Sequence, residues 1–181
     1  MLKISRYKTH WVNLLFLVTL VITLAIMMPN GTTAANVGPQ IGNQAPDFTL
    51  NNLASKSVGL YQVIKENKVT LINFWGMWCP YCVQEIPELV DFYKQYHQRR
   101  VEILAINVGD NPNVVPLFVK EKQMSFPVLI DKNNWVNNLY QITGFPTTFI
   151  IDSQGKIKDM IVGGTNQAAL AAKVEMVLTG K

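Results

Sequence analysis

Residues 69–82 read VTLINFWGMWCPYC and place two cysteines, Cys79 and Cys82, directly after a short apolar run. The β-branched and aromatic residues at 69–74 predict a buried central strand. From about residue 79 to residue 98, apolar side chains recur at the spacing of one helix face. The cysteine pair is therefore expected at the junction where a strand ends and a helix begins.

This position gives the two sulfurs different properties. Free N–H groups and the positive end of the dipole at a helix N-terminus stabilise a thiolate, so Cys79 is predicted to be the nucleophile. Cys82 lies about one turn further along and is predicted to be the resolving thiol. Pro80 suits the first helical position, where no N–H is required. Pro87 removes a donor inside the helix and predicts a kink.

Other uses of a Cys-x-x-Cys pair fit the sequence poorly. A zinc site needs two further ligands, and the chain has no other cysteine and only His10 and His97. Covalent haem attachment requires histidine after the second cysteine, where the chain has Val83. A purely structural bridge across so short a loop would constrain the unfolded chain little. We therefore expect no metal and no cofactor, with the disulfide between the two cysteines as the redox group.

The same patterns predict the rest of the fold. Strands are expected at 101–108, 127–130, 147–151 and 156–162, and helices at 113–122, 135–140 and 166–178. A turn at 152–155 joins the last two strands into an antiparallel hairpin. This order implies an α/β fold with a mixed central sheet flanked by helices.

The positive charge is concentrated at the N-terminus. Lys3, Arg6 and Lys8 are three of the 16 basic residues, and the first 28 residues contain no acid. The remaining chain carries 13 basic and 12 acidic side chains. Because a nucleic-acid-binding domain is expected to have a basic face, this balance argues against nucleic acid as a partner.

The basic segment precedes an uncharged apolar one. Residues 11–28 read WVNLLFLVTLVITLAIMM, and as a helix they would span roughly 27 Å, enough to cross a bilayer's hydrocarbon core. This predicts a single-pass membrane anchor with residues 1–10 in the cytoplasm and the rest outside the cell membrane. The alternative is a signal peptide cleaved near residues 32–35. Residues 29–45 predict a tether, and residues 46–181 a single folded domain.

Three stretches match a known family: IGNQAPDFTL at 41–50, NFWGMWCPYC at 73–82 and GFPTTFIID at 144–152. In these motifs the chain resembles the membrane-anchored, thioredoxin-like thiol–disulfide oxidoreductases of the ResA/TlpA group. The resemblance implies a thioredoxin-like fold with an extra N-terminal β-hairpin at about residues 47–60. It also implies reduction of disulfides in extracytoplasmic client proteins, most often apocytochrome c, with some members acting in spore-envelope synthesis. Electrons would come from a CcdA- or DsbD-like membrane protein, and we expect a monomer.

The sequence departs from this group between the two cysteines, and from cytosolic thioredoxins at residue 73. The residues between the cysteines are Pro80 and Tyr81, as in glutaredoxins, whereas the group usually has proline in the second place; reductant strength therefore stays open. Asn73 replaces the buried aspartate of cytosolic thioredoxins and cannot titrate. Glu85 lies on the helix face of Cys82, and by resemblance it exchanges a proton with that thiol. The alternative is that Glu85 only stabilises the helix N-terminus.

The resemblance also assigns a client-binding surface. GFPTTF matches the cis-proline loop of thioredoxin-like proteins, so the Phe145–Pro146 bond is expected to be cis, with the Phe145 backbone free to pair with an extended client. The residues expected to bind the client are Trp78, Pro80, Tyr81, Phe145, Pro146 and Thr147. Trp75 and Trp78 are candidates either for an apolar collar around the thiolate or for core packing.

Three other functions share features with this sequence. A peroxiredoxin shares the APDFTL opening, but peroxide reduction requires Pro and Thr or Ser where the chain has Ile72 and Gly76. A disulfide-forming oxidase would use the same fold, but the reduction potential of its cysteine pair would be higher. A non-catalytic module that holds clients is the third alternative, and an intact dithiol argues against it.

Overall fold

The computed structural model describes residue 14, residues 16–20 and residues 36–180. The chain divides into two units, residues 1–34 and 35–181. In the first unit, the described residues are helical and their side chains are exposed. Among all described residues, no helix has both the length and the apolar character needed to cross a membrane. Most of the predicted anchor, at 11–28, lies outside the described residues, as do the predicted cytoplasmic segment and the first part of the tether.

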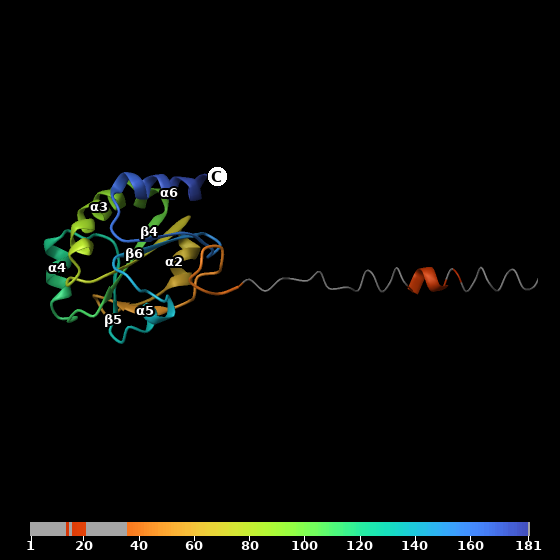
Figure 1. The fold of residues 1–181 in the computed structure, drawn as a ribbon, viewed down its shortest axis with the longest axis horizontal. Coiled ribbons are helices and arrows are strands. Elements are labelled where there is room, and N and C mark those ends of the chain that lie inside the picture. The colour runs from red at the N-terminus through yellow and green to blue at the C-terminus, as the bar shows by residue number, and fades with distance from the viewer. Residues whose placement is uncertain (1–13, 15, 21–35, 181) are drawn as a thin grey trace, which may run out of the picture. The chain divides into compact units, whose positions relative to one another are not determined.

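The second unit alternates strands and helices in nearly the predicted order (Figure 1). Its elements are β1 (Thr49–Asn52), β2 (Ser57–Gly59), α2 (Leu60–Glu66), β3 (Val69–Trp75), α3 (Pro80–Tyr96), η1 (His97–Arg99), β4 (Val101–Val108), α4 (Val115–Glu121), β5 (Val128–Asp131), α5 (Trp135–Leu139), β6 (Thr147–Asp152), β7 (Ile157–Val162) and α6 (Gln167–Thr179). The predicted N-terminal hairpin is confirmed as β1 and β2, which pair antiparallel. Helix α3 continues through Pro87 without interruption.

Helix α2 was not predicted from the sequence. It is short, and its N-cap Gly59 makes no side-chain hydrogen bond, so the usual signal for a helix start is missing. Its buried residues are Leu60 and Ile64, one turn apart. Packing of these two side chains on the sheet, rather than local propensity, accounts for this helix.

In the described part of the chain, seven strands form one mixed sheet in the order β2-β1-β5-β4-β3-β6-β7. Strands β3, β4 and β5 are parallel, and every other neighbouring pair is antiparallel. Trp75 at the end of β3 pairs with Asn107 near the end of β4, and Phe74 pairs with Thr147 at the start of β6. The segments after β3 and β4 and the loop before β6 therefore meet at one edge of the sheet, where the cysteines lie.

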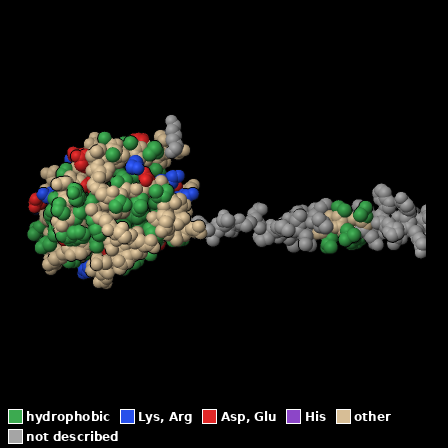
Figure 2. Space-filling view, in the orientation of Figure 1, with side chains coloured by type: hydrophobic (Ala, Val, Ile, Leu, Met, Phe, Trp, Pro, Cys, Tyr) green, Lys and Arg blue, Asp and Glu red, His purple; other side chains and the backbone are tan. Residues whose placement is uncertain are grey.

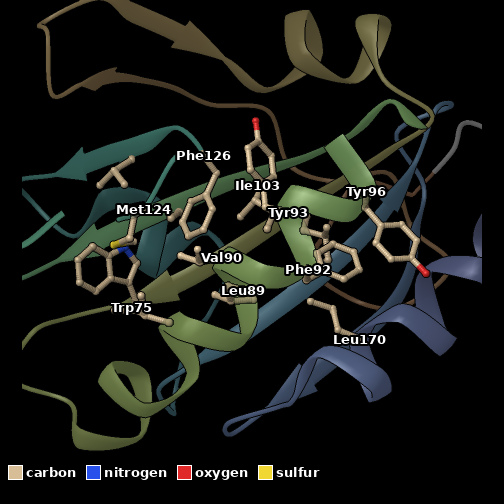
Figure 3. Close-up of a cluster of buried hydrophobic side chains, with 14 of the residues drawn as sticks. Trp75, Leu89, Val90, Phe92, Tyr93, Tyr96, Ile103, Met124, Phe126 and Leu170 are labelled. Carbon is tan, nitrogen blue, oxygen red and sulfur yellow. The ribbon is translucent and has the colours of Figure 1, made fainter. Parts of the chain in front are cut away.

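The strands separate two cores. In β3, Leu71 and Trp75 belong to the core beneath α3, α4 and α6, whereas Ile72 and Phe74 belong to the core beneath α2 and α5. Figure 3 shows the first of these cores, where α3 packs along the sheet and beside α6. The α3 residues predicted to face the core are all buried: Ile86, Leu89, Val90, Tyr93 and Tyr96. Burial of this helix face fixes the N-terminus of α3 against the end of β3.

The folded domain begins before residue 46, the boundary predicted from the sequence. The Gly42 N–H donates to the Ile157 carbonyl at 2.8 Å, and the Ala45 N–H donates to the Gly155 carbonyl at 2.9 Å. The described end of the predicted tether, residues 36–45, is therefore bound to the β6–β7 turn and to the start of β7. Glycine, asparagine and proline form compact loops as readily as flexible ones, so composition alone does not separate the two cases.

Candidate functional site

The cysteine pair lies in the first turn of α3, as the sequence predicts. Cys79 is the N-cap of α3, and Pro80 occupies the first helical position. The Cys79 Sγ accepts a hydrogen bond from the Cys82 N–H at 3.1 Å. The two residues form a disulfide, and they are 5% and 2% exposed, respectively. The helix N-terminus thus faces the Cys79 sulfur, which favours a thiolate there once the disulfide is reduced.

The two tryptophans around this turn have different environments. Trp75 is buried and stacks on Phe118 of α4 with ring centroids 5.7 Å apart, so it is a core residue. Trp78 is 55% exposed, and its Nε1 donates to the Val108 carbonyl at 2.9 Å. The Trp78 ring meets Phe145 edge-on at a centroid distance of 4.9 Å. Trp78 therefore links the cysteine loop to the loop that carries Phe145.

The predicted cis-proline loop is confirmed. The Phe145–Pro146 peptide bond is cis, and the Pro146 carbonyl accepts the Gly163 N–H at 2.8 Å. The Thr147 hydroxyl donates to the Gly144 carbonyl at 2.8 Å, and Thr147 is buried. The buried Thr147 side chain therefore stabilises the loop by this hydrogen bond. Phe145 is half-buried beside Trp78.

Glu85 is a buried carboxyl one helical turn after Cys82. It is 3% exposed, and within the described residues neither carboxyl oxygen has a hydrogen-bond partner of good geometry. With Tyr81 and residues 164–166, it lines a cavity of about 440 Å³. Burial raises the pKa of Glu85 to about 8, and the nearby Thr165 main chain offsets part of that rise. A carboxyl with this pKa can take up and release a proton near neutral pH.

Asn73 lies in β3, where cytosolic thioredoxins have aspartate. Its side-chain amide donates to the Thr148 hydroxyl at 2.9 Å, and both residues are buried. This hydrogen bond joins β3 to β6, but neither group can exchange a proton at physiological pH. The position therefore stabilises the sheet and leaves proton exchange to another residue.

Apolar side chains are exposed around the cysteine loop. Tyr81, between the cysteines, is 68% exposed, and Trp78 just before them is 55% exposed. Pro80, between the cysteines, is also exposed. Figure 2 shows hydrophobic side chains gathered on the α4 side of the domain. Such a surface suits a protein client with apolar residues beside its disulfide.

Asp110, in the loop after β4, is not among the site residues predicted from the sequence. The carboxylate of Asp110 accepts hydrogen bonds from the Met77 N–H and from the Asn107 side chain, each at 2.7 Å. The strand order alone brings this loop beside the cysteines, and the one available signal was a polar residue following a parallel strand. A larger cavity, of about 620 Å³, lies between the β1–β2 hairpin and the starts of α4 and α5, and none of the predicted site residues line it.

The fold and the dithiol together define the class of protein. A mixed sheet flanked by helices, with a disulfide at a helix N-terminus beside a cis-proline loop, is the arrangement of the thioredoxin-like thiol–disulfide oxidoreductases. Comparisons with known proteins agree. The model of the AhpC/TSA family matches residues 41–160.

Similar proteins narrow this class to a family. Thiol-disulfide oxidoreductase ResA of Bacillus subtilis is 30% identical over 165 residues, which cover 91% of each chain. ResA of Geobacillus thermodenitrificans is 36% identical over 137 residues, covering 76% of this chain and 78% of its own. A solved thiol:disulfide interchange protein of Chlorobium tepidum matches with a TM-score of 0.68 and 27% identity, over 77% of this chain and 98% of its own. The chain therefore belongs to the AhpC/TSA family and, within it, to the ResA-like thiol–disulfide oxidoreductases.

Proposed function

We propose that the protein reduces disulfides in client proteins outside the cytoplasmic membrane, chiefly in the Cys-x-x-Cys-His haem site of apocytochrome c. The observation that carries the thiol–disulfide exchange is a disulfide at the N-terminus of α3, one turn from a buried carboxyl of pKa about 8. The ResA relatives support this class of reaction. The client, and a CcdA- or DsbD-like membrane protein as electron donor, follow from the resemblance to the ResA/TlpA group.

The proposed reaction is a dithiol–disulfide exchange. The Cys79 thiolate attacks one sulfur of the client disulfide, a mixed disulfide forms, and one client thiolate leaves. Cys82 then attacks the Cys79 Sγ, the second client thiolate leaves, and the Cys79–Cys82 disulfide forms. Two electrons pass to the client, and the two protons lost by the cysteines balance those taken up by the client thiolates. The donor returns two electrons and two protons, and no further cofactor takes part.

Glu85 handles the proton of Cys82 in this scheme. It follows Cys82 by one helical turn and is buried, and its raised pKa lets it accept a proton when Cys82 becomes a nucleophile. When the disulfide is reduced again, the same carboxyl returns the proton. The Asn73 side chain cannot titrate, so in this scheme the buried carboxyl of Glu85 on α3 exchanges the proton.

The client binds across the exposed apolar surface beside the cysteines. Its main chain, in an extended conformation, pairs with Phe145 next to the cis-proline, a form of β-augmentation. Trp78, Pro80 and Tyr81 contact the side chains around the client disulfide. This arrangement presents one client sulfur to Cys79.

The reduction potential of the Cys79/Cys82 couple tests the direction of electron flow. We expect a value near that of thioredoxin, about −270 mV, measured by equilibration with glutathione or dithiothreitol buffers. A value near about −120 mV, as for strong periplasmic oxidants, would instead establish a disulfide-forming oxidase.

Exchange kinetics test the role of Glu85. We expect Glu85→Gln to fold and to slow disulfide exchange on the order of a hundredfold where proton transfer limits the rate. The control is Glu121→Gln, which removes an exposed carboxylate from α4 and is expected to exchange at the wild-type rate. If Glu85→Gln exchanges disulfides at the wild-type rate between about pH 6 and 9, the Glu85 carboxyl only stabilises the N-terminus of α3.

The proposed location places residues 1–10 in the cytoplasm, residues 11–28 in the membrane and the folded domain outside. Protease added to intact spheroplasts should digest the domain and leave a short N-terminal remnant in the membrane. A native protein whose N-terminal sequence begins near residue 35 or 36 would instead establish signal-peptide cleavage.

A further inference from the structure

The active-site loop is attached to the rest of the protein by the residues that follow β4. The Asp110 Oδ2 accepts the Met77 N–H at 2.7 Å, and Met77 lies two residues before Cys79. The Val108 carbonyl accepts the Trp78 Nε1–H at 2.9 Å. Both residues of the 77–78 segment are therefore bound to the 108–110 segment, one through its main chain and the other through its side chain.

Two glycines make this close approach possible. A Cβ on Gly76 would overlap the Trp78 indole. Gly109 has a φ of +80°, in the region that favours glycine, and a Cβ there would come within 3.4 Å of the indole nitrogen. The chain thus turns sharply after β4 and brings the Asp110 carboxylate to the Met77 amide.

The Asp110 carboxylate is itself held in place. The side chain of Asn107, which is 1% exposed, donates to the same Oδ2 at 2.7 Å. Asn107 belongs to β4, and its backbone is paired with Trp75 of β3. Short hydrogen bonds to a charged acceptor are roughly twice as strong as neutral ones. The Met77 amide is therefore connected to a buried residue of the central sheet through a single carboxylate oxygen.

We propose that Asp110 is a positioning residue for the dithiol. By fixing the Met77 main chain, it sets the path by which the chain enters α3, and so the place of the Cys79 sulfur at the helix N-terminus. That sulfur faces the Cys82 N–H only while Cys79 keeps its capping conformation. The inference deepens the thiol–disulfide exchange function and does not depend on the client or on the direction of electron flow.

Two substitutions separate positioning from charge. Asp110→Asn keeps an oxygen that can accept both hydrogen bonds and removes only the charge, whereas Asp110→Ala removes both. If Asp110 positions the loop, the alanine variant exchanges more slowly and the asparagine variant largely recovers the rate. If its negative charge were the important property, both variants would instead form the Cys79 thiolate more readily, because a nearby negative charge opposes ionisation of a thiol.

Asp152 provides a matched control. Its Oδ1 likewise accepts two main-chain N–H groups, those of Gln154 and Lys156, each at 2.9 Å. It pairs with Val69 at the start of β3, at the opposite edge of the sheet from the cysteines. Asp152→Ala therefore removes the same kind of contact far from the dithiol.

The test uses the reduced full-length chain in detergent. The rate of Cys79 alkylation by iodoacetamide is measured as a function of pH. The rate of disulfide exchange is measured with the aromatic disulfide 5,5′-dithiobis(2-nitrobenzoate). We expect Asp110→Ala to slow both reactions on the order of tenfold at neutral pH and to move the midpoint of the alkylation profile upward. Asp110→Asn should stay within about threefold of wild type, and Asp152→Ala should match it even if its Tm falls.

Equal rates for Asp110→Ala and wild type would overturn the inference, as would an asparagine variant as slow as the alanine variant. If Asp110→Ala does not fold, Asn107→Ala removes the support of the carboxylate and should slow exchange in the same direction; an unchanged rate there also counts against positioning. A wild-type protein that fails to exchange with the probe would refute the exchange function itself, which is a separate result.

Discussion

The buried carboxyl of Glu85 predicts an unusual dependence of stability on pH. Its pKa is about 8 in the folded protein, compared with an ordinary value of 4.5. Between these values the folded state binds the proton more tightly than the unfolded state. Stability therefore falls as pH rises through this window, because the carboxyl must either stay protonated or ionise in a buried site. Glu85→Gln removes the titration and leaves a neutral side chain of similar shape.

The size of the effect follows from the two pKa values. A difference of one pKa unit corresponds to about 1.36 kcal/mol. At pH 5 the carboxyl is still protonated in the folded protein. The stability difference between wild type and Glu85→Gln should therefore lie within about 1 kcal/mol of its value at low pH. Between pH 5 and 8 the variant should gain about 3 to 4 kcal/mol relative to wild type. Above pH 8 the difference should level off.

Urea unfolding of the oxidised proteins at pH 5, 6, 7 and 8, followed by tryptophan fluorescence, measures this difference. Glu121→Gln retains the Glu85 carboxyl, so it should keep the wild-type decline. Comparing variants at each pH cancels the titration of all other groups. If the gap between wild type and Glu85→Gln changes by less than about 1 kcal/mol across this range, the Glu85 carboxyl does not carry the raised pKa.

Other predictions test the dithiol and the core. In the reduced protein, iodoacetamide should modify Cys79 well before Cys82, as peptide mass analysis would show; the reverse order would contradict the nucleophile assignment. Cys82→Ser should trap a client through a mixed disulfide at Cys79, and recovery of only the electron donor would argue for a different partner class. Phe149→Ala, which removes a buried ring packed edge-on against Tyr140, should lower the free energy of unfolding by about 3–5 kcal/mol in urea. The exposed Met160→Ala should change it by about 0.5 kcal/mol or less.

Local sequence patterns were sufficient for much of this protein. The apolar run before Cys79, the helical spacing after it and Pro80 at the first helical position placed the dithiol at a strand-to-helix junction, where the structure has it. The alternation of strands and helices indicated a mixed sheet, and the resemblance carried by residues 144–152 indicated the cis bond. These features depend on residues that are only a few positions apart, so they can be predicted from the sequence pattern.

Contacts between distant segments were decided only by the tertiary structure. Helix α2 has no strong start signal and depends on burial of Leu60 and Ile64 against the sheet. The pKa of Glu85 depends on how completely the surrounding elements exclude water from its carboxyl. Asp110 reaches Met77, 33 positions earlier in the chain, because β3 and β4 lie side by side in parallel. The sequence lists these residues, but only the packing of the strands and helices sets their distances, and hydrogen bonding and desolvation depend on those distances.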